Sequence, residues 1–214
     1  MKSILLILFV CLSSVLSLAQ NQSTQFDYGK IENNQYQNDY FNFTIDIPED
    51  WFVQNKAQIE ALQKQGKQMM AGDDEELNTI FEISEINTAN LLSVNKYELG
   101  APVEFNPSFG IVVENISHAP GVKKGSDYLF QVKRLLKQSK MNYEHIDEKF
   151  KKTIISGHTF YLMKCEIQYL DVSITQVYYT TITKMFAFSF ITTYTDKKQR
   201  KELMEIFDSI SFKK

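Results

Sequence analysis

Three histidines are the side chains of this chain best suited to proton transfer, because an imidazole titrates at roughly pH 6.5. They are His118, His145 and His158, and they lie far apart in the sequence. His158 follows Ser156 and Gly157, which favour a turn, so we interpret it as a solvated turn residue. The chain has no His-Glu-x-x-His motif, no Gly-x-Ser-x-Gly motif and no glycine-rich phosphate loop. Local motifs therefore indicate no catalytic residue.

A cysteine and a run of acids could supply a nucleophile or a metal site, but their surroundings favour structural roles. Cys165 alternates with Met163 and Ile167 on one strand face, so we predict a buried, unreactive thiol. Four acids at positions 73–76 lack the glycine and the alternating oxygen ligands of a calcium loop. Acids favour a first helical turn, so we interpret them as a helix start. The sequence predicts no metal and no cofactor, and a site assembled from distant residues is the remaining route to catalysis.

The N-terminus has the pattern of an export signal. Lys2 supplies a positive start, residues 4–18 are mainly apolar, and Ser17-Leu18-Ala19 places small residues where an export peptidase reads them. The sequence predicts a cleaved signal peptide over residues 1–19, with Gln20 as the new N-terminus. The mature chain is then expected in the periplasm or outside the cell.

This segment has two alternative roles, a membrane helix and a lipid anchor. The apolar run is shorter than the roughly 20 residues that span a bilayer, and polar residues 20–23 follow it directly, which disfavours a membrane helix. Lipidation at Cys11 would need a small residue before the cysteine, where Val10 stands instead. A soluble mature chain without a transmembrane segment is therefore expected, and lipidation at Cys11 is the alternative.

Composition describes an acidic globular domain. The chain has 214 residues and a formal net charge of −3, and cleavage would remove Lys2. Proteins that bind nucleic acid are usually strongly basic, so no nucleic-acid partner is expected. Cleavage also leaves Cys165 as the one cysteine, so an internal disulfide cannot form. Residues 20–35 are polar and are predicted to be a flexible lead-in, and residues 36–214 are predicted to form a single domain.

Apolar residues at helical spacing predict four helices. Two of them cover about residues 55–71, ending at Gly72, and residues 73–86, with a strand at Phe81-x-Ile83 as the alternative for part of the second. The third is predicted to be capped by Ser126, with an apolar stripe over residues 128–136 and Lys133 on the polar side. The fourth covers residues 197–208 and is capped by Asp196.

Strict alternation of apolar residues predicts strands. They cover residues 41–47, 91–94, 109–117, 161–169, 172–178 and 186–191. The last strand is apolar on both faces, which indicates a sheet that is covered on both sides. Thr183-Lys184 is predicted to connect the last two strands, and Trp51 is predicted to plug the core. The fold class is therefore α+β, an α/β/α sandwich with a central antiparallel sheet and helices on both faces.

Residues 99–108 are predicted to form the longest irregular loop of the domain. Loops on a rigid scaffold often hold the residues that bind partners. The candidate binding residues are Leu99, Pro102, Glu104, Phe105, Asn106, Pro107 and Ser108.

Several motifs resemble the PsbP-like superfamily. They are a Tyr-x-Asn-x-Tyr-Phe-x-Phe strand ending in Ile-Pro-x-x-Trp (residues 36–51), Asp-Tyr-Leu (127–129), Gln-x-Tyr-Tyr (176–179) and Ser-Ile-x-Phe (209–212). This superfamily includes the photosystem II subunit PsbP and the Ran-binding protein Mog. The resemblance covers most of residues 36–212 and implies an exported bacterial α/β/α sandwich that acts as a non-catalytic partner of a larger assembly. No functional motif of either relative is matched at named positions, so no metal or Ran contact is carried over.

The sequence thus favours an exported, non-catalytic binding or assembly domain. Its expected partner is a protein or a component of the cell envelope, held by the loop or by an exposed sheet edge. One alternative is a hydrolase or another ligand-processing enzyme with a pocket that holds a histidine beside a carboxylate. Another is a carrier of a small molecule or lipid, which the aromatic hairpins would line.

Overall fold

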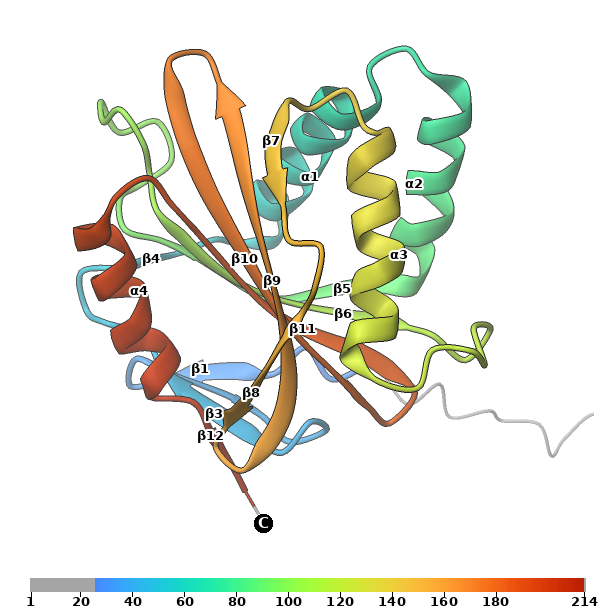
Figure 1. The fold of residues 1–214 in the computed structure, drawn as a ribbon. Coiled ribbons are helices and arrows are strands. Elements are labelled where there is room, and N and C mark those ends of the chain that lie inside the picture. The colour runs from blue at the N-terminus through green and yellow to red at the C-terminus, as the bar shows by residue number, and fades with distance from the viewer. Residues whose placement is uncertain (1–25, 214) are drawn as a thin grey trace, which may run out of the picture.

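A large antiparallel sheet forms the centre of the molecule (Figure 1). The computed structural model describes residues 26–213. The strand order is β4-β5-β6-β11-β10-β9-β7, and β8 also pairs with β9. The strands are β4 (Phe52–Val53), β5 (Thr88–Asn95), β6 (Ser108–Asn115), β7 (Tyr143–Ile146), β8 (Lys151–Ile155), β9 (His158–Tyr169), β10 (Val172–Thr183) and β11 (Phe186–Tyr194).

A second, smaller sheet lies against one face of the first. Its order is β1-β2-β3-β12, and its strands are β1 (Lys30–Glu32), β2 (Gln35–Asn38), β3 (Phe43–Asp46) and β12 (Ser211–Phe212). The prediction of a flexible lead-in over residues 20–35 is therefore wrong for β1. All three residues of β1 are exposed, and β1 is held by its backbone pairing with β2. Such a strand has no apolar alternation that a sequence pattern could detect.

Four helices complete the described part of the chain. They are α1 (Lys56–Ala71), α2 (Glu75–Asn87), α3 (Gly125–Gln138) and α4 (Lys197–Asp208). Helices α2 and α3 lie over one face of the large sheet, whereas α4 and the small sheet share the other face (Figure 1). The predicted α/β/α sandwich is confirmed, with the small sheet as an addition that the sequence did not indicate.

The main core lies between the two sheets and α4. Phe43 of the small sheet packs against Phe188 of β11 with ring centroids 5.2 Å apart, and both side chains are fully buried. Alternating residues of β3 and β11 point into this core, as their periodicity predicted. Trp51 is also buried there. A second core under α3 contains Leu129, Leu136, Ile146, Met163 and Cys165.

Helix α3 corrects two predictions. It begins at Gly125 with Lys124 as its N-cap residue, so Ser126 does not cap it. The Asp127 carboxylate accepts hydrogen bonds from the backbone N–H groups of Lys123 and Lys124, which moves the helix start upstream of Ser126. Lys133, predicted to point into solvent, is buried. Its aliphatic stem can lie along the core because its ammonium group reaches the Glu148 carboxylate at 2.5 Å.

The other local predictions differ less from the structure. Asp196 caps α4 as expected, because its carboxylate accepts hydrogen bonds from the N–H groups of Lys198 and Gln199. The turn between β10 and β11 lies at Lys184-Met185 rather than Thr183-Lys184, and both of its residues have positive φ. Within residues 26–213, no helix is both long enough and apolar enough to cross a membrane.

Candidate functional site

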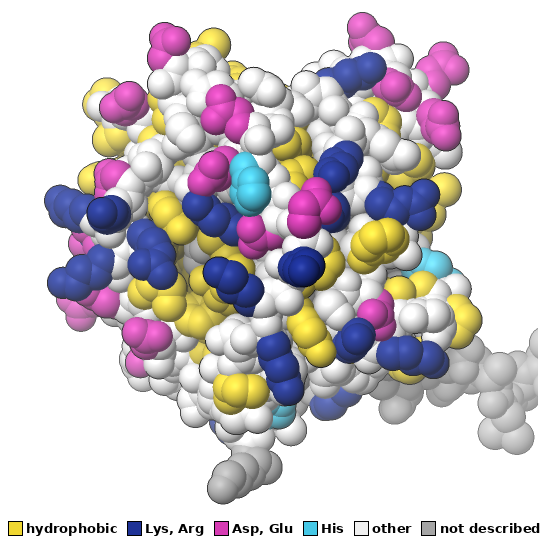
Figure 2. Space-filling model, in the orientation of Figure 1, with side chains coloured by type: hydrophobic (Ala, Val, Ile, Leu, Met, Phe, Trp, Pro, Cys, Tyr) yellow, Lys and Arg dark blue, Asp and Glu magenta, His cyan; other side chains and the backbone are white. Residues whose placement is uncertain are grey.

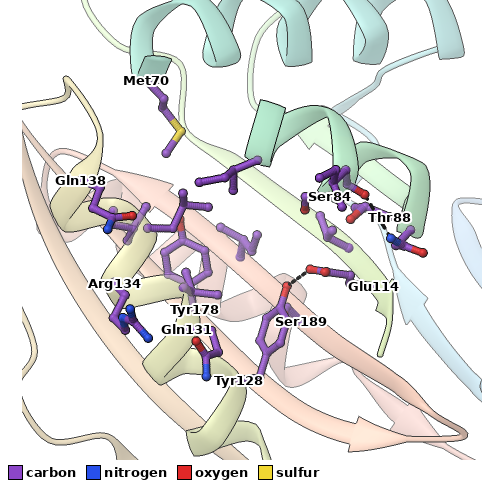
Figure 3. A pocket seen from close by; sticks show the side chains of 18 of the residues that line it. Met70, Ser84, Thr88, Glu114, Tyr128, Gln131, Arg134, Gln138, Tyr178 and Ser189 are labelled. Carbon is purple, nitrogen blue, oxygen red and sulfur yellow. Dashed lines mark hydrogen bonds between the residues drawn. The ribbon is translucent and has the colours of Figure 1, made fainter. Parts of the chain in front are cut away.

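An open groove of about 550 Å³ lies between α2 and α3 (Figure 3). Its walls are the facing sides of these two helices, and its floor is formed by β6, β10 and β11. Met70 of α1 and His118, which follows β6, also line it. Most of its surface is apolar, although nine of the nineteen lining residues are polar or charged, Arg134 among them. Clefts of this size, with a few placed polar groups, are typical of small-molecule sites.

The α2 wall of the groove contains two isoleucines that the fold leaves partly exposed, together with Ser84 and Asn87. Asp74 starts the helix by accepting a hydrogen bond from the N–H of Leu77, and Leu77 is the one buried residue of α2. Farther along the helix, Ile80 and Ile83 line the groove, and Ile83 is 57% exposed. Apolar surface exposed in a concave site favours an apolar ligand, because burying that surface is stabilising.

The floor of the groove is apolar in its middle. Val112 of β6 and Ile191 of β11 lie there beside Tyr178 of β10, which is paired directly with Ile191. The Tyr178 hydroxyl donates a hydrogen bond to the Gln176 side-chain oxygen at 2.5 Å. Burial raises the pKa of Tyr178 well above its usual value, so this phenol stays neutral. The floor therefore offers a rigid apolar surface without a charged group in its middle.

A tyrosine and a carboxylate form the strongest polar contact of the groove. Tyr128 of α3 donates its hydroxyl proton to Glu114 of β6, with 2.6 Å between the two oxygens (Figure 3). Burial, followed by the neighbouring charge of Glu114, raises the pKa of Tyr128 well above its usual value. This phenol therefore stays a donor, and the Glu114 carboxylate keeps acceptor capacity for a ligand. Sequence reasoning missed the pair because Tyr128 matched the apolar stripe of its helix and Glu114 lies in a strand far away.

The structure separates the three histidines. His118 lines the groove, whereas His145 lines a second hollow of about 430 Å³ together with Glu144 and Glu148. His145 lies 3.1 Å from the carboxylate of Asp147. His158 is exposed at the first position of β9, and its ring packs on Phe212 at 4.4 Å between centroids. In the described range, no group of three or more His, Cys, Asp or Glu side chains could hold a metal ion.

Cys165 is enclosed by the second core. Its side chain is fully buried, and burial together with the nearby Asp147 charge raises the pKa of the thiol to about 12. A thiol in this setting is protonated at neutral pH and is not a nucleophile. The predicted burial of Cys165 is confirmed.

The predicted binding loop lies away from the groove. The register of β5 and β6 pairs Thr88 with Glu114 at the groove end and Asn95 with Ser108 at the loop end. Ser108 belongs to β6, and Pro107 is buried. The other candidate residues, Leu99, Pro102, Glu104, Phe105 and Asn106, are exposed or half-buried.

The loop is also closed on itself. The Asn106 side chain accepts a hydrogen bond from the N–H of Tyr97 and donates one to the Tyr97 carbonyl, at 2.9 and 2.8 Å. This double contact fixes the neck of the loop. The loop and the groove are therefore two separate surfaces, and a role of the loop in binding stays a prediction.

The two edges of the large sheet differ. Strand β4 is only two residues long, and at the other edge β7 and β8 both pair with β9. Lys151 and Lys152 of β8 are exposed. Short edge strands and edge lysines disfavour the addition of a further strand, which weakens the case for a partner that pairs with the large sheet. The predicted cleavage site at Ala19 and Gln20 and the alternative lipidation site at Cys11 lie outside the described residues.

Comparisons with known proteins find similarity among solved structures. No protein-family model matches the chain, and no curated protein sequence matches it. The structure is similar to LpqN of Mycobacterium tuberculosis, described as involved in cell envelope biogenesis, with a TM-score of 0.45 and 8% identity over 80% of this chain and 83% of that one. It is also similar to a protein from Bacteroides thetaiotaomicron, with a TM-score of 0.42 and 14% identity over 81% of this chain and 46% of that one.

A third similar structure is cyanobacterial PsbP from Synechocystis, with a TM-score of 0.46 and 10% identity over 86% of this chain and 98% of that one. The α+β sandwich assigned to the present chain follows from its own strand order and helices.

Proposed function

We propose that this chain is an exported, non-catalytic binding domain whose ligand site is the groove between α2 and α3. The observation that carries the proposal is the apolar groove itself, with exposed isoleucines on one wall and Val112, Tyr178 and Ile191 on its floor. Binding as the general role is the same as the one inferred from the sequence. The surface is different, because the groove takes the place of the loop at residues 99–108.

The groove suits an amphipathic small molecule. Its apolar body would cover the floor, and a hydrogen-bond donor on the ligand would meet the Glu114 carboxylate beside Tyr128. A half-buried acceptor of this kind favours ligands that present a donor, because a ligand that covers the carboxylate without a donor leaves it unmatched and costly to desolvate. The small-molecule or lipid carrier considered from the sequence is therefore the form of binding that this groove supports best.

A matched pair of variants tests the groove. Ile83 lines it, whereas Ile86 lies on the same helix, is 84% exposed and does not line it. The probes are a solvatochromic naphthalene dye and a long-chain fatty amine. Ile83→Asp is expected to weaken binding of both by at least about tenfold, because it places a charge on an apolar wall. Ile86→Asp is expected to change the dissociation constant by less than about twofold.

Two results would contradict the assignment. One is the absence of saturable binding of either probe to the parent chain. The other is an equal loss of binding in the Ile83→Asp and Ile86→Asp variants, which would point to a general effect on α2. Urea unfolding of both variants shows whether each is folded under the conditions of the binding assay.

A second candidate function is a ligand-processing enzyme, favoured by the presence of His118 and Glu114 in one groove. A hydrolase of this kind would turn over a panel of chromogenic acyl esters, and His118→Ala would abolish that turnover without weakening binding of the dye. The proposed binding domain is expected to show no turnover that depends on His118.

Export is tested separately by mass spectrometry of the chain recovered from an expressing bacterium. The proposal expects an N-terminus at Gln20. A diacylglyceryl-modified Cys11 would instead establish a lipoprotein.

A further inference from the structure

One of the charged side chains that line the groove is an arginine without an ion pair. Arg134 of α3 is exposed at the groove, and no carboxylate of the described residues pairs with it. Only two of the 23 Lys and Arg residues of the chain are arginines, Arg134 and Arg200. A guanidinium group presents a planar fork of N–H donors that matches a carboxylate or a phosphate, whereas an ammonium group is a point charge. An arginine at the groove therefore suits a ligand that carries one of these two anions.

The neighbouring cations of α3 differ from Arg134 in this respect. Lys133 and Lys137 both contact the Glu148 carboxylate, at 2.5 and 3.1 Å. Figure 2 shows cations and carboxylates interspersed over the side of the molecule that faces the viewer. The residues one turn away from Arg134 on α3, at positions 130, 131, 137 and 138, include no acid. The helix therefore supplies no partner for the guanidinium group.

The opposite wall of the groove supplies no partner either. The α2 residues that line it, Ile80, Ile83, Ser84 and Asn87, are uncharged. The carboxylates of Glu82 and Glu85 on α2 lie 3.1 and 3.9 Å from the Lys67 ammonium group of α1 instead. Glu114 is therefore the one carboxylate among the residues that line the groove.

This carboxylate lies apart from Arg134. Glu114 accepts the hydrogen bond of Tyr128, which precedes Arg134 on α3 by about 9 Å along the helix axis. No ion pair joins Glu114 to Arg134, and Figure 3 shows the two side chains on opposite sides of Tyr178 in the view. The groove thus presents one positive and one negative group at separate places beside its apolar floor.

We propose that the ligand of the groove is a zwitterionic amphiphile, with an ammonium group for Glu114 and a carboxylate or phosphate for Arg134. This inference rests on the proposed binding function of the groove. A ligand that covers these two side chains without opposite charges leaves them unmatched, which costs free energy. The apolar body of the ligand lies on Val112, Tyr178 and Ile191 and excludes water, which strengthens both ion pairs. The two charges therefore select the head group, and the floor selects the apolar chain.

Competition against the solvatochromic dye tests the head group. Dodecylamine carries the cation alone and dodecanoate the anion alone, whereas N-dodecyl-β-alanine and dodecyl phosphoethanolamine carry both, with a carboxylate and a phosphate respectively. All four are used below the concentrations at which they form micelles. The parent chain is expected to bind at least one zwitterion at least about tenfold more tightly than either singly charged probe. The zwitterion that binds more tightly shows whether the anion is a carboxylate or a phosphate.

A matched pair of arginine variants locates the anion of the ligand. Arg134→Gln is expected to lower the preference for the zwitterion over dodecylamine by at least about tenfold. Arg200→Gln removes the other arginine, which lies on α4 at the opposite face of the large sheet, and is expected to change this preference by less than about twofold. Glu114→Gln is expected to lower the preference for the zwitterion over dodecanoate by at least about tenfold. Urea unfolding shows whether the three variants are folded.

Three results would overturn the proposal. The first is binding of both zwitterions no tighter than that of dodecylamine. The second is an unchanged preference in Arg134→Gln, and the third is an equal loss of preference in the two arginine variants. If the parent chain binds the dye but gives one of these results, the groove stays a binding site and only the zwitterionic head group is wrong. If the parent chain binds no dye, the proposed function of the groove fails as well.

Discussion

Gly125 shows how tightly a single residue positions one wall of the groove. It is the first residue of α3, and a Cβ atom built on it would lie 2.0 Å from the carbonyl oxygen of Thr180 in β10. Such a distance is far inside van der Waals contact, and the clash is with backbone that cannot rotate away. The start of α3 therefore rests directly on the sheet because position 125 has no side chain.

Gly125→Ala is expected to lower the free energy of unfolding by about 3 kcal/mol, because α3 must move off β10. Gly121→Ala is the matched control, since a Cβ there would meet no atom within 4 Å. That change is expected to stay within about 0.5 kcal/mol of the parent. Urea titrations monitored by circular dichroism measure both, and similar losses in the two variants would contradict the close contact.

A second feature at the scale of single residues is Glu148, whose carboxylate accepts hydrogen bonds from two lysines. Hydrogen bonds from Lys133 and then Lys137 hold the pKa of Glu148 at about 2, below its usual 4.5. Folding therefore favours the charged form of Glu148. The resulting stabilisation is complete above pH 4.5 and is lost as the pH falls towards 2.

Glu148→Gln should remove this pH-dependent contribution. The free energy of unfolding of the parent is expected to exceed that of the variant by a constant amount above pH 4.5, and the gap should close as the pH falls to about 2. Glu144→Gln is a control on an exposed residue of β7 without an ion pair among the described residues. Urea unfolding curves measured across this pH range test the prediction. A difference in the free energy of unfolding that does not depend on pH would contradict the link between Glu148 ionisation and stability.

At the scale of elements, helix caps explain where α3 and α4 begin. Asp196 satisfies the N–H groups of Lys198 and Gln199, whereas Ser126, which looked like a cap in the sequence, lies inside α3. Serine is a frequent cap and lysine is not, so residue type alone favours Ser126 over the start at Lys124 that the structure shows. The helix begins upstream of Ser126 because the Asp127 carboxylate accepts hydrogen bonds from the backbone N–H groups of Lys123 and Lys124.

Replacing the two residues separates these roles. Asp196→Ala is expected to lower the free energy of unfolding by about 1 kcal/mol, the usual contribution of a helix cap. Ser126→Ala is expected to change it by less than about 0.5 kcal/mol. Thermal and urea unfolding of both variants measure the difference, and a larger loss in Ser126→Ala would restore Ser126 as the cap.

At the scale of the whole molecule, burial is distributed unevenly. The large sheet carries both cores, whereas α1 has one buried residue, Ala71, and α2 has one, Leu77. The central strands β10 and β11 are paired on both sides. Among the four described helices, α1 and α2 therefore have the least packing to hold them in place, and α2 forms one wall of the groove.

This distribution predicts the pattern of hydrogen exchange. Amides of α1 and α2 are expected to exchange through local opening, with protection factors at least about a hundredfold below those of β10 and β11. Peptide-resolved mass spectrometry of the native chain measures both. A ligand in the groove should slow exchange in α2 selectively, and uniform protection across all four elements would show that the hairpin does not open independently.

Much of the fold follows from local patterns in the sequence. The amphipathic repeats of α3 and α4 and the alternation along β3, β9 and β11 each report which side of one element is buried. Periodicity is a local property, so it reveals these elements without knowledge of their neighbours. It also identified the doubly covered sheet and the buried position of Cys165.

The candidate site between α2 and α3 could not be predicted from such local patterns. The Tyr128–Glu114 pair, the burial of Lys133 beside Glu148 and the pairing of exposed β1 all join residues that no periodic signal connects. The groove arises because α2 and α3 lie over the same face of the sheet and leave its floor uncovered between them. The sequence by itself determined which residues prefer the interior, and only the tertiary structure decided where apolar surface stays exposed, because that depends on how separate elements meet.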